Sequence, residues 1–414
     1  MSTESVADFR ARARSWLADN MPKADPADAR ALQRDSDQTW KRARELQRRL
    51  YDGGFAGICF PREYGGLGLS FEHKKAFDAE TVGYEIPLIL NVPCFAICCA
   101  TLLDMGSEQQ KRSHIAAALR GDEVLVQLLS EPSGGSDLAG VITRAERRGD
   151  TWVINGAKTW STWAFAADYG LCLARTDWGV PKHEGLTMFL MPLRHKGITM
   201  NRIKQLDGTE DFCEEFFDDV ELTDDAVVGE PGKGWEVASR QLYHERRTMG
   251  DGSEFTSGPG ITAAADIQID LPLLVEKAGG TDDPKIRAIA GRALAHRAVG
   301  ELLSVHVYNA VLSGALPPAA GSIIRAYMAQ AHNVETDAAH EIAGIAAVVD
   351  DDPDLLGIGT RYLGRQIANI GGGTSEMAHN VIGERVLNFP REYAADRGVP
   401  FNQVKRNKQE GKHR

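Results

Sequence analysis

The sequence predicts a mainly α-helical protein with a β domain in its middle. Apolar residues recur at helical spacing over residues 1–124, at strand-like spacing over 125–236, and at helical spacing again over 237–414. A compact β domain between an N-terminal helical domain and a C-terminal helical bundle accounts for these changes. Two long, alanine-rich amphipathic stretches, 286–312 and 322–349, are expected to pack on one another in the bundle.

The composition is that of an ordinary globular protein. The chain has 414 residues, of which 43% are hydrophobic and 25% charged, so it is long enough for two or three packed units. A formal net charge of -11 argues against binding to nucleic acid or to an acidic membrane. The charged residues 1–10 contain no apolar core and do not resemble a secretory signal.

Neither a membrane span nor a metal site is expected. The longest apolar stretch, 86–103, is interrupted by prolines and an asparagine, which favours a buried core helix. The six cysteines lie mostly inside apolar runs. Cys94 and Cys98 are one helical turn apart, but no histidine or second cysteine pair completes a metal site. Reduced core thiols in a cytoplasmic protein are therefore expected.

Individual elements follow from local signals. Ser107 and Gln110 have the spacing of a capping box at the start of a helix. Residues 151–160 suggest a β-hairpin, with Asn155 and Gly156 in the turn. Further strands are expected in the β domain at 171–175, 186–192 and 212–222.

Glu245 is the first candidate for chemistry. Ala238, Leu242, Glu245 and Met249 fall at spacings of four, three and four, so they share one helical face. A carboxylate on an apolar face costs free energy unless it is paired or protonated, and such a setting raises its pKa as a general base requires. The alternative is that residues 244–247 form a solvated charged patch, which is the more common situation for glutamate.

Three further segments could bind a ligand or could be ordinary connections. Residues 127–137 run from a strand into a Pro/Gly/Ser loop that could bind a ring or a phosphate, or could simply turn the chain. The tryptophan in 158–162 could stack on a planar cofactor or form a cross-strand pair. The three glycines in 370–376 allow close backbone approach or a turn. No phosphate loop or dinucleotide-binding glycine motif is present.

Taken together and in order, these segments resemble the acyl-CoA dehydrogenase family. The resemblance runs from residue 53 to 392, and its most specific strings are Ser130-Glu-Pro-Ser-Gly-Gly-Ser-Asp137, Asn155-Gly-x-Lys-Thr-Trp-Ser-Thr162 and Gly373-Thr-Ser-Glu376, followed by Gly383-Glu-Arg-Val386. It implies an N-terminal helical domain, a β-barrel-like middle domain, a C-terminal four-helix bundle and FAD as cofactor.

The resemblance also implies roles for particular residues. Ser130 would hydrogen-bond the flavin ring, while Trp160 and Thr162 would lie against it, with Thr162 near N5. The remaining implied contacts are Ser136 where the CoA arm passes, Thr374 and Glu376 reaching the cofactor from the glycine-rich loop, and Arg246 holding the base helix and the CoA portion.

The position of the base departs from the commonest family pattern. Many members carry it in a Tyr-Glu-Gly-Thr loop, where this chain has Gly372. The isovaleryl-CoA and long-chain branches instead place it on a helix immediately before an arginine, which corresponds to Glu245 and Arg246. By this resemblance Glu245 removes the α-proton, and the backbone N–H of Gly372 and a flavin ribityl hydroxyl hold the thioester carbonyl. The product is a trans-2-enoyl-CoA, formed in β-oxidation of fatty acids or of a sterol side chain.

A second departure concerns the partner. Homotetrameric members show an Arg-x-x-Phe-Gly segment that binds the FAD of a neighbouring subunit, and residues 276–285 lack it. The later adenine-contact loop also differs, at 339–345. We therefore expect an α2β2 assembly with a homologous subunit, and electron-transfer flavoprotein as electron acceptor. The alternatives are an acyl-CoA oxidase or flavin monooxygenase, and a non-catalytic subunit. The room beside Gly372 is compatible with a branched or sterol-derived acyl group and does not exclude a long linear one.

Overall fold

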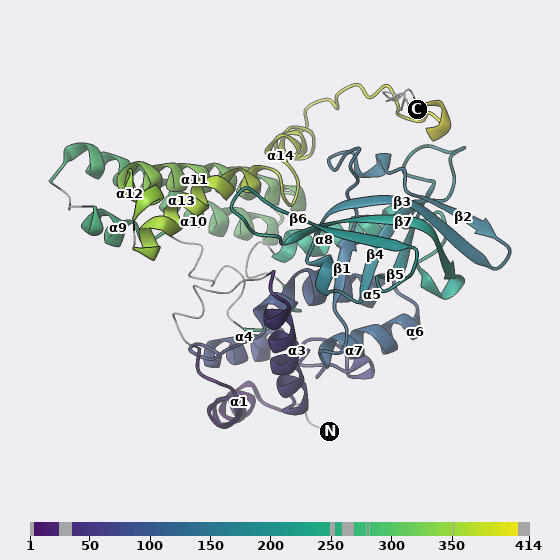
Figure 1. Cartoon of the computed structure of the whole chain (residues 1–414), viewed down its shortest axis with the longest axis horizontal. Helices are drawn as coiled ribbons and strands as arrows, with labels where there is room; N and C mark the ends of the chain where they lie inside the picture. The colour runs from purple at the N-terminus through teal and green to yellow at the C-terminus, as the bar shows by residue number, and fades with distance from the viewer. Residues whose placement is uncertain are drawn as a thin grey trace. The chain divides into compact units, whose positions relative to one another are not determined.

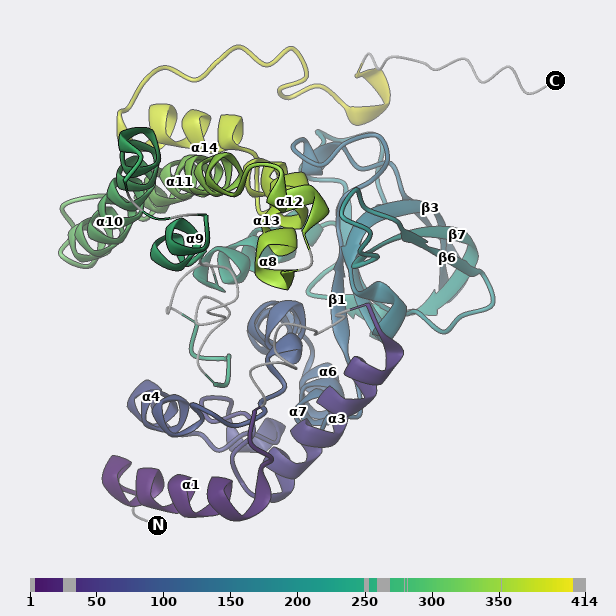
Figure 2. The ribbon, with the colours of Figure 1, turned by 60° about the vertical axis from the view of Figure 1, so that its left-hand side comes forward.

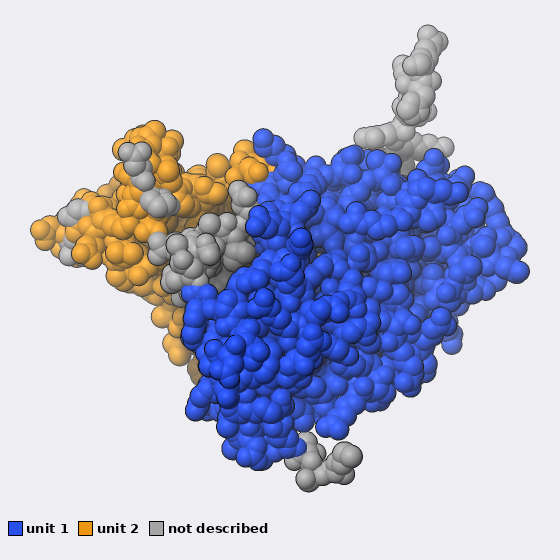
Figure 3. Space-filling view, turned by 60° about the horizontal axis from the view of Figure 1, so that its bottom comes forward, with its two compact units in different colours: residues 1–204, 209–264, 394–414 blue, residues 205–208, 265–393 orange. Residues whose placement is uncertain are grey.

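The structure is a computed structural model that describes residues 4–24, 35–248, 253–258, 269–278, 280, 282–350 and 352–404. The chain divides into two compact units, which are described separately (Figure 3). Unit 1 consists of Met1–Lys204, Thr209–Ala264 and Ala394–Arg414, and unit 2 of Gln205–Gly208 and Ala265–Tyr393.

The first part of unit 1 is helical, and local caps explain where its helices begin. The hydroxyls of Ser5 and Ser36 accept hydrogen bonds from backbone N–H groups at the starts of α1 and α3. The predicted capping box at Ser107 and Gln110 is confirmed at α6. Helix α1 packs against α4 (Figure 2). The helices are α1 (Val6–Asn20), α3 (Asp37–Asp52), α4 (Phe71–Glu80), α5 (Ala100–Met105), α6 (Glu108–Gln110) and α7 (Ala116–Leu119).

The apolar stretch lies in the core, as expected. A wide helix, Asn91–Cys99, leads directly into α5, and its side chains belong to the main core cluster of unit 1. Within the part of the chain that the structure describes, Leu88–Met105 is the one stretch long and apolar enough to cross a membrane, and 67% of it is buried. All six cysteines are free thiols, and all but Cys59 are buried.

The middle of unit 1 is an eight-stranded sheet in the order β6-β7-β3-β2-β4-β5-β8, with β1 pairing in parallel to β4 (Figure 1). The three strands predicted after the proposed hairpin are confirmed as β4, β5 and β7. The strands are β1 (Leu125–Leu128), β2 (Arg144–Arg148), β3 (Thr151–Thr162), β4 (Tyr169–Arg175), β5 (Leu186–Pro192), β6 (Ile198–Ile203), β7 (Phe212–Thr223) and β8 (Val227–Val228).

The predicted hairpin at Asn155 and Gly156 is wrong, because β3 runs unbroken through both residues. The side chain of Asn155 exchanges two 3.0 Å hydrogen bonds with Asp219 on β7, so it joins two strands. Gly156 lies at a bulge where an added Cβ would come 2.7 Å from the Cα of Thr143. The Asn-Gly pair therefore marks a close approach of backbones, and the turn lies earlier, between β2 and β3.

Helix α8 (Gly234–Thr248) follows the sheet in unit 1 and carries the candidate base, Glu245. It packs against β5, α5 and the wide helix. Residues 253–258, which follow this helix, are not helical, and the rest of the glycine-rich segment 250–260 lies outside the described residues. Asn91 holds this segment by donating to the carbonyl of Ser257 at 2.7 Å and accepting from its N–H at 2.9 Å.

Unit 2 is a helical bundle in which α10 and α13 both pack against α11. The predicted helix 286–312 is confirmed as α10, whereas the predicted helix 322–349 is wrong in its last turn. Gly344 has φ 58°, which ends α11 and starts a separate short helix. The helices are α9 (Leu271–Lys277), α10 (Pro284–Leu312), α11 (Gly321–Ala343), α12 (Ala346–Val349), α13 (Pro353–Gly364) and α14 (Ser375–Val381).

Candidate active site

Helix α8 places Glu245 at the edge of its buried face. Ala238 is fully buried and Leu242 packs against the core cluster, so the predicted apolar face exists as far as the described residues extend. Met249, the last member of the predicted face, lies outside them. Glu245 is half-buried and Arg246 is exposed. The carboxylate therefore lies between the protein interior and the surface.

Gln127 on β1 is a direct partner of this carboxylate. Its Nε2 donates a hydrogen bond of 2.9 Å to Oε2 of Glu245 across 118 residues of sequence. The Cys98 thiol lies close by: burial, reinforced by the charges of Cys94 and Glu245, raises its pKa well above the usual range. Cys98 is therefore an uncharged neighbour of Glu245.

His244, the residue before Glu245, is buried and anchors α8 to α5. Its Nε2 lies 2.7 Å from Oδ2 of Asp104, which also accepts from Arg240. Burial lowers the pKa of His244, although Asp104 opposes this effect. Residues 244–247 are thus not a uniformly solvated patch, because His244 belongs to the core side of the helix and Glu245 has a partner on another element.

The loop after β1 is tied to β3 by a buried ion pair. Nζ of Lys158 lies 2.9 Å from Oε1 of Glu131, and both side chains are almost completely buried. Burial raises the pKa of Glu131, but Lys158 and the backbone N–H groups of Ile142 and Thr143 outweigh it and lower the pKa overall. The loop that follows is thereby held in a fixed relation to β3.

Ser130 and Ser136 lie on this loop. The carbonyl of Ser130 accepts a 3.0 Å hydrogen bond from Thr159, so the serine is held beside the end of β3. Its hydroxyl faces Gly135, where an added Cβ would lie 3.3 Å away. Ser136 is exposed, as are its loop neighbours. Two hydroxyls and the adjoining backbone are therefore available to a ligand on this side of the sheet.

Trp160 forms an exposed aromatic platform next to this loop. It bulges out of β3 with φ 62°, an unfavourable conformation for a bulky side chain, and its surface is 58% exposed. Its ring is perpendicular to that of Phe212, at a centroid distance of 5.9 Å, and Thr162 pairs with the same residue in the sheet. Strain of this kind persists at ligand sites. The residues present fit a planar ring such as a flavin.

A buried acid lies on the strand paired with this platform. Glu215 on β7 is fully buried and accepts a 2.8 Å hydrogen bond from Ser161. Burial raises its pKa from 4.5 to about 8, against the opposing effects of Ser161 and Lys158. In the folded protein at neutral pH this carboxyl is therefore mostly protonated.

The Glu215→Gln variant is expected to remove a pH dependence of stability. The folded protein keeps a proton on Glu215 that the unfolded chain releases between pH 4.5 and about 8, so this group makes the wild type progressively less stable over that range. Urea unfolding at pH 5.5, 7 and 8.5 should show the wild type losing stability relative to the variant as pH rises. Exposed Glu221, on the same strand, provides the Glu221→Gln control. A constant difference between wild type and Glu215→Gln would contradict the expectation.

The other candidate residues belong to unit 2. The glycine-rich loop has two left-handed residues, Gly372 at φ 69° and Gly373 at φ 95°, and Arg325 donates to the carbonyls of Gly371 and Gly373 at 2.6 and 2.9 Å. Thr374 caps α14 through a 3.2 Å hydrogen bond from Met377. The backbone N–H of Glu376 and the Thr374 hydroxyl lower the pKa of Glu376, which is exposed.

Four buried or half-buried polar residues of this region were not predicted to belong to the site, namely Gln127, Lys158, Glu215 and Gln241. For Gln127 the usable signal was a polar residue inside the apolar run 124–129, and Lys158 was recognised only as part of a motif. No cluster of three metal-ligating side chains occurs among the residues that the structure describes.

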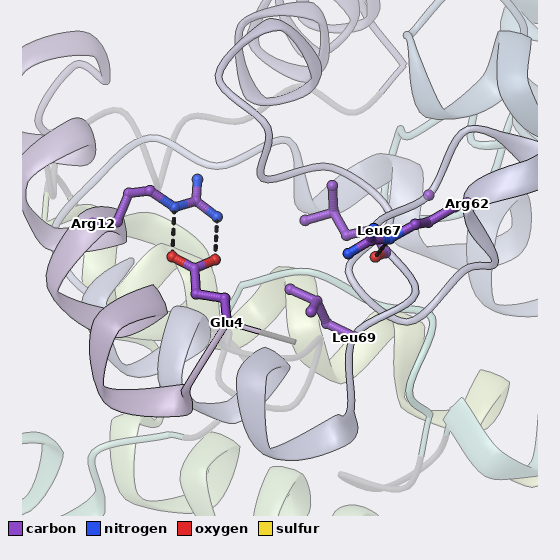
Figure 4. Close-up of a pocket in the computed structure, with 6 residues that line it drawn as sticks. Glu4, Arg12, Arg62, Leu67 and Leu69 are labelled. Atoms are coloured by element: carbon purple, nitrogen blue, oxygen red, sulfur yellow. Dashed lines mark hydrogen bonds and ion pairs between the residues drawn. The ribbon is translucent and has the colours of Figure 1, made fainter. Parts of the chain in front are cut away.

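A separate surface pocket of about 350 Å³ lies near the N-terminus of unit 1 and contains none of these residues (Figure 4). Two of its lining side chains, Glu4 and Arg12, are paired with each other at 2.9 Å. Its other lining residues are Arg62, Gly66, Leu67 and Leu69. Glu4 and Arg12 form an ion pair with each other, so the Glu4 carboxylate is a weaker candidate for a catalytic base than Glu245.

The fold and these residues define an α-helical flavoprotein oxidoreductase with a central β domain. Family models for the N-terminal, middle and C-terminal domains of acyl-CoA dehydrogenases match residues 3–122, 127–220 and 232–387. The chain belongs to the acyl-CoA dehydrogenase family, whose members are flavoproteins that oxidise CH–CH bonds. The expected fold class is therefore confirmed.

Individual relatives support the same assignment. The acyl-CoA dehydrogenase IpdE1 of Mycobacterium tuberculosis is 34% identical over 394 residues, covering 94% of this chain and 99% of the relative. The solved structure of the Tcur3481-Tcur3483 steroid ACAD is similar at 27% identity and TM-score 0.73, covering 95% of this chain and 99% of the other. The ChsE4-ChsE5 complex from Mycobacterium tuberculosis is similar at 25% identity and TM-score 0.71, with 95% and 99% covered.

Proposed function

We propose that the chain catalyses α,β-dehydrogenation of an acyl-CoA thioester with Glu245 as the base. The observation that carries this proposal is the hydrogen bond from Gln127 to a half-buried Glu245, in the same compact unit as Ser130 and Trp160. A carboxylate that a neighbouring side chain holds in position can act as a general base.

Ser130, Trp160 and Thr162 would hold the flavin ring of FAD, and Thr374 and Glu376 would contact the cofactor from the glycine-rich loop. When bound, FAD accepts the hydride that leaves the β-carbon. Glu245 takes the α-proton onto its carboxylate, and the electron pair of the broken C–H bond forms the new double bond. The protein contributes position and electrostatics.

The developing negative charge on the thioester carbonyl requires hydrogen-bond donors. We propose the backbone N–H of Gly372 for this role, together with a ribityl hydroxyl of the cofactor. The left-handed φ of Gly372 favours a residue without a side chain, which agrees with a purely backbone contribution. Arg246 and Ser136, both exposed, would contact the CoA portion.

An anaerobic titration tests this function. The purified, FAD-loaded protein is mixed with acyl-CoA thioesters, and loss of the oxidised flavin absorbance reports dehydrogenation. Rapid recovery of that absorbance in oxygen would favour an oxidase or monooxygenase, whereas recovery only with electron-transfer flavoprotein supports a dehydrogenase that uses this acceptor. Absence of any reduction, alone or with a homologous subunit, would support the non-catalytic alternative.

The Gln127→Leu variant is expected to react about 10-fold more slowly at neutral pH, because the carboxylate loses the donor that orients and stabilises it. Since the lost hydrogen bond favoured the charged form of Glu245, the pKa of this base in the kinetic pH profile should rise. The measurement is the acid limb of the kcat/KM profile against pH. A fall in rate without movement of that limb would contradict direct contact with the base. Ser239→Ala, at an exposed position of α8, is the control.

We propose a hetero-oligomer with a homologous acyl-CoA dehydrogenase subunit. Residues 276–285 lack the family's FAD-binding arginine motif, and Lys277 is engaged with Asp352 and Asp354 at 2.6 and 2.8 Å. Large apolar side chains are exposed on α10, namely Leu302, Val305, Tyr308 and Leu312. Multi-angle light scattering and flavin analysis of the chain, alone and co-expressed, test the idea. A fully flavin-loaded homotetramer of the chain alone would rule it out.

For the acyl group we propose a branched or sterol-derived chain. The base stands on α8, and position 372 carries no side chain that would fill the space beside the α-carbon. Similarity to a protein described as a steroid ACAD supports this choice. A panel of linear, branched and sterol side-chain acyl-CoAs, assayed with and without the partner subunit, tests it. Equal or greater kcat/KM for long linear thioesters would contradict it.

A further inference from the structure

The side chain of Gln241 is fully buried and poorly hydrogen-bonded. Within the described part of the chain, neither its amide oxygen nor its amide nitrogen makes a geometrically adequate hydrogen bond. A contact with the Cys98 thiol remains: Gln241 lowers the pKa of this thiol, whereas burial has the larger effect and raises it. A thiol is a weak partner, so the amide remains largely unsatisfied.

Its polar neighbours do not share this defect. Thr101 donates to the carbonyl of Ile97 at 2.7 Å, and His244 is paired with Asp104. Gln127 is bonded to Glu245. A buried donor or acceptor without a hydrogen bond destabilises the folded protein. In native proteins such a group commonly binds a ligand or a water, or has a chemical role. Gln241 differs from these three groups because both of its amide atoms lack a hydrogen bond.

Gln241 lies one helical turn before Glu245, so both side chains leave α8 on the same side. Helix α8 packs against the wide helix Asn91–Cys99, and both groups influence the Cys98 thiol on that helix. Gln241 is fully buried and Glu245 is half-buried. The amide therefore lies deeper in the protein than the carboxylate, on the same side of α8.

We propose that Gln241 binds an uncharged oxygen substituent, a hydroxyl or a keto group, on the acyl portion of the substrate. The inference rests on the proposed dehydrogenase function and narrows its substrate class. An amide donates and accepts, so a hydroxyl satisfies both of its atoms and a keto group satisfies its nitrogen, whereas a hydrocarbon satisfies neither. A carboxylate would need a cation, and the cation adjacent in sequence, Arg240, is engaged with Asp104.

Paired substrates test the proposal. Acyl-CoA thioesters of one carbon skeleton are compared with and without a hydroxyl or keto group at successive positions beyond the β-carbon, by anaerobic flavin reduction in the FAD-loaded protein with its partner. We expect kcat/KM of the wild type to favour one oxygenated member by about 100-fold. Gln241→Leu and Gln241→Met should lose that preference and process the hydrocarbon at least as well as the wild type does. Ser239→Ala should keep the wild-type preference.

The outcomes separate this inference from the proposed function. Flavin reduction with equal kcat/KM for both members of every pair would overturn the role of Gln241 and leave the dehydrogenase function standing. No reduction by any thioester would contradict the function itself. If both Gln241 variants slow all substrates by the same factor, the amide is structural and the inference is wrong. Thermal melting of each variant establishes that it is folded before its kinetics are compared.

Discussion

Replacing Glu245 by glutamine is expected to slow acyl-CoA-dependent flavin reduction by roughly 10⁴-fold, the upper range for loss of a general base. An amide of the same shape cannot accept the α-proton. It can still meet Gln127, because its carbonyl oxygen accepts the hydrogen bond that now reaches Oε2 at 2.9 Å. Fold, FAD content and acyl-CoA binding should therefore change little, and the loss should appear in the rate of the chemical step.

The measurement is stopped-flow flavin reduction under anaerobic conditions, with bound FAD quantified by absorbance. Glu236→Gln is a matched control, because Glu236 lies on the same helix but is exposed and forms a surface ion pair with Lys233. Wild-type reduction rates in Glu245→Gln would show that another group, or a partner subunit, supplies the base. The flavoprotein fold would then remain, without a catalytic role for α8.

The largest expected effect on stability comes from Lys158. Changing it to methionine should lower the free energy of unfolding by about 3–5 kcal/mol, the usual cost of removing one member of a buried ion pair. Glu131 would keep its backbone donors at 2.7 and 2.8 Å but lose the ammonium group that now lies 2.9 Å away. Lys158 also donates to the carbonyl of Leu129 at 3.0 Å, so the loop that carries Ser130 loses a second restraint.

Urea or thermal unfolding measures this loss, and FAD retention should fall with it. Glu131→Gln combined with Lys158→Met should recover part of the stability, because no unpaired charge remains buried. Lys233→Met is the control, since Lys233 takes part in an exposed pair with Glu236 and should cost less than about 1 kcal/mol. A loss as small as the control's would mean that the buried pair contributes little to holding the loop.

Much of the fold could be predicted because it depends on local periodicity. Short strand-like apolar segments located β4, β5 and β7, and the Ser107–Gln110 cap located α6. The errors arose where a local signal has two physical meanings. Asn155 and Gly156 are typical of a tight turn. Here the Asn155 side chain hydrogen-bonds to the neighbouring strand, and Gly156 allows two backbones to lie close together. The apolar spacing predicts a helix that continues through Gly344, whereas the positive φ of this residue ends α11.

The candidate site was harder, because its contacts join distant segments. The helical spacing predicted that Glu245 lies on an apolar face, yet its partner Gln127 is 118 residues away and no local rule connects them. The Glu131–Lys158 pair likewise depends on how the loop meets β3. The strained φ of Trp160 comes from a bulge that residue propensities do not reveal. The assignment of Glu245 as the base remains a prediction.

The placement of Glu245 on α8 has a consequence for the way such a sequence can diversify. Glu245, Gln127 and Trp160 all belong to unit 1, so their mutual distances do not depend on the glycine-rich loop of unit 2. If α8 carries the base, that loop does not supply the proton acceptor, and substitutions around it leave Glu245 and its hydrogen bond to Gln127 in place. Substitutions that accumulate in that loop can change the space for the acyl group while Glu245 on α8 stays unchanged.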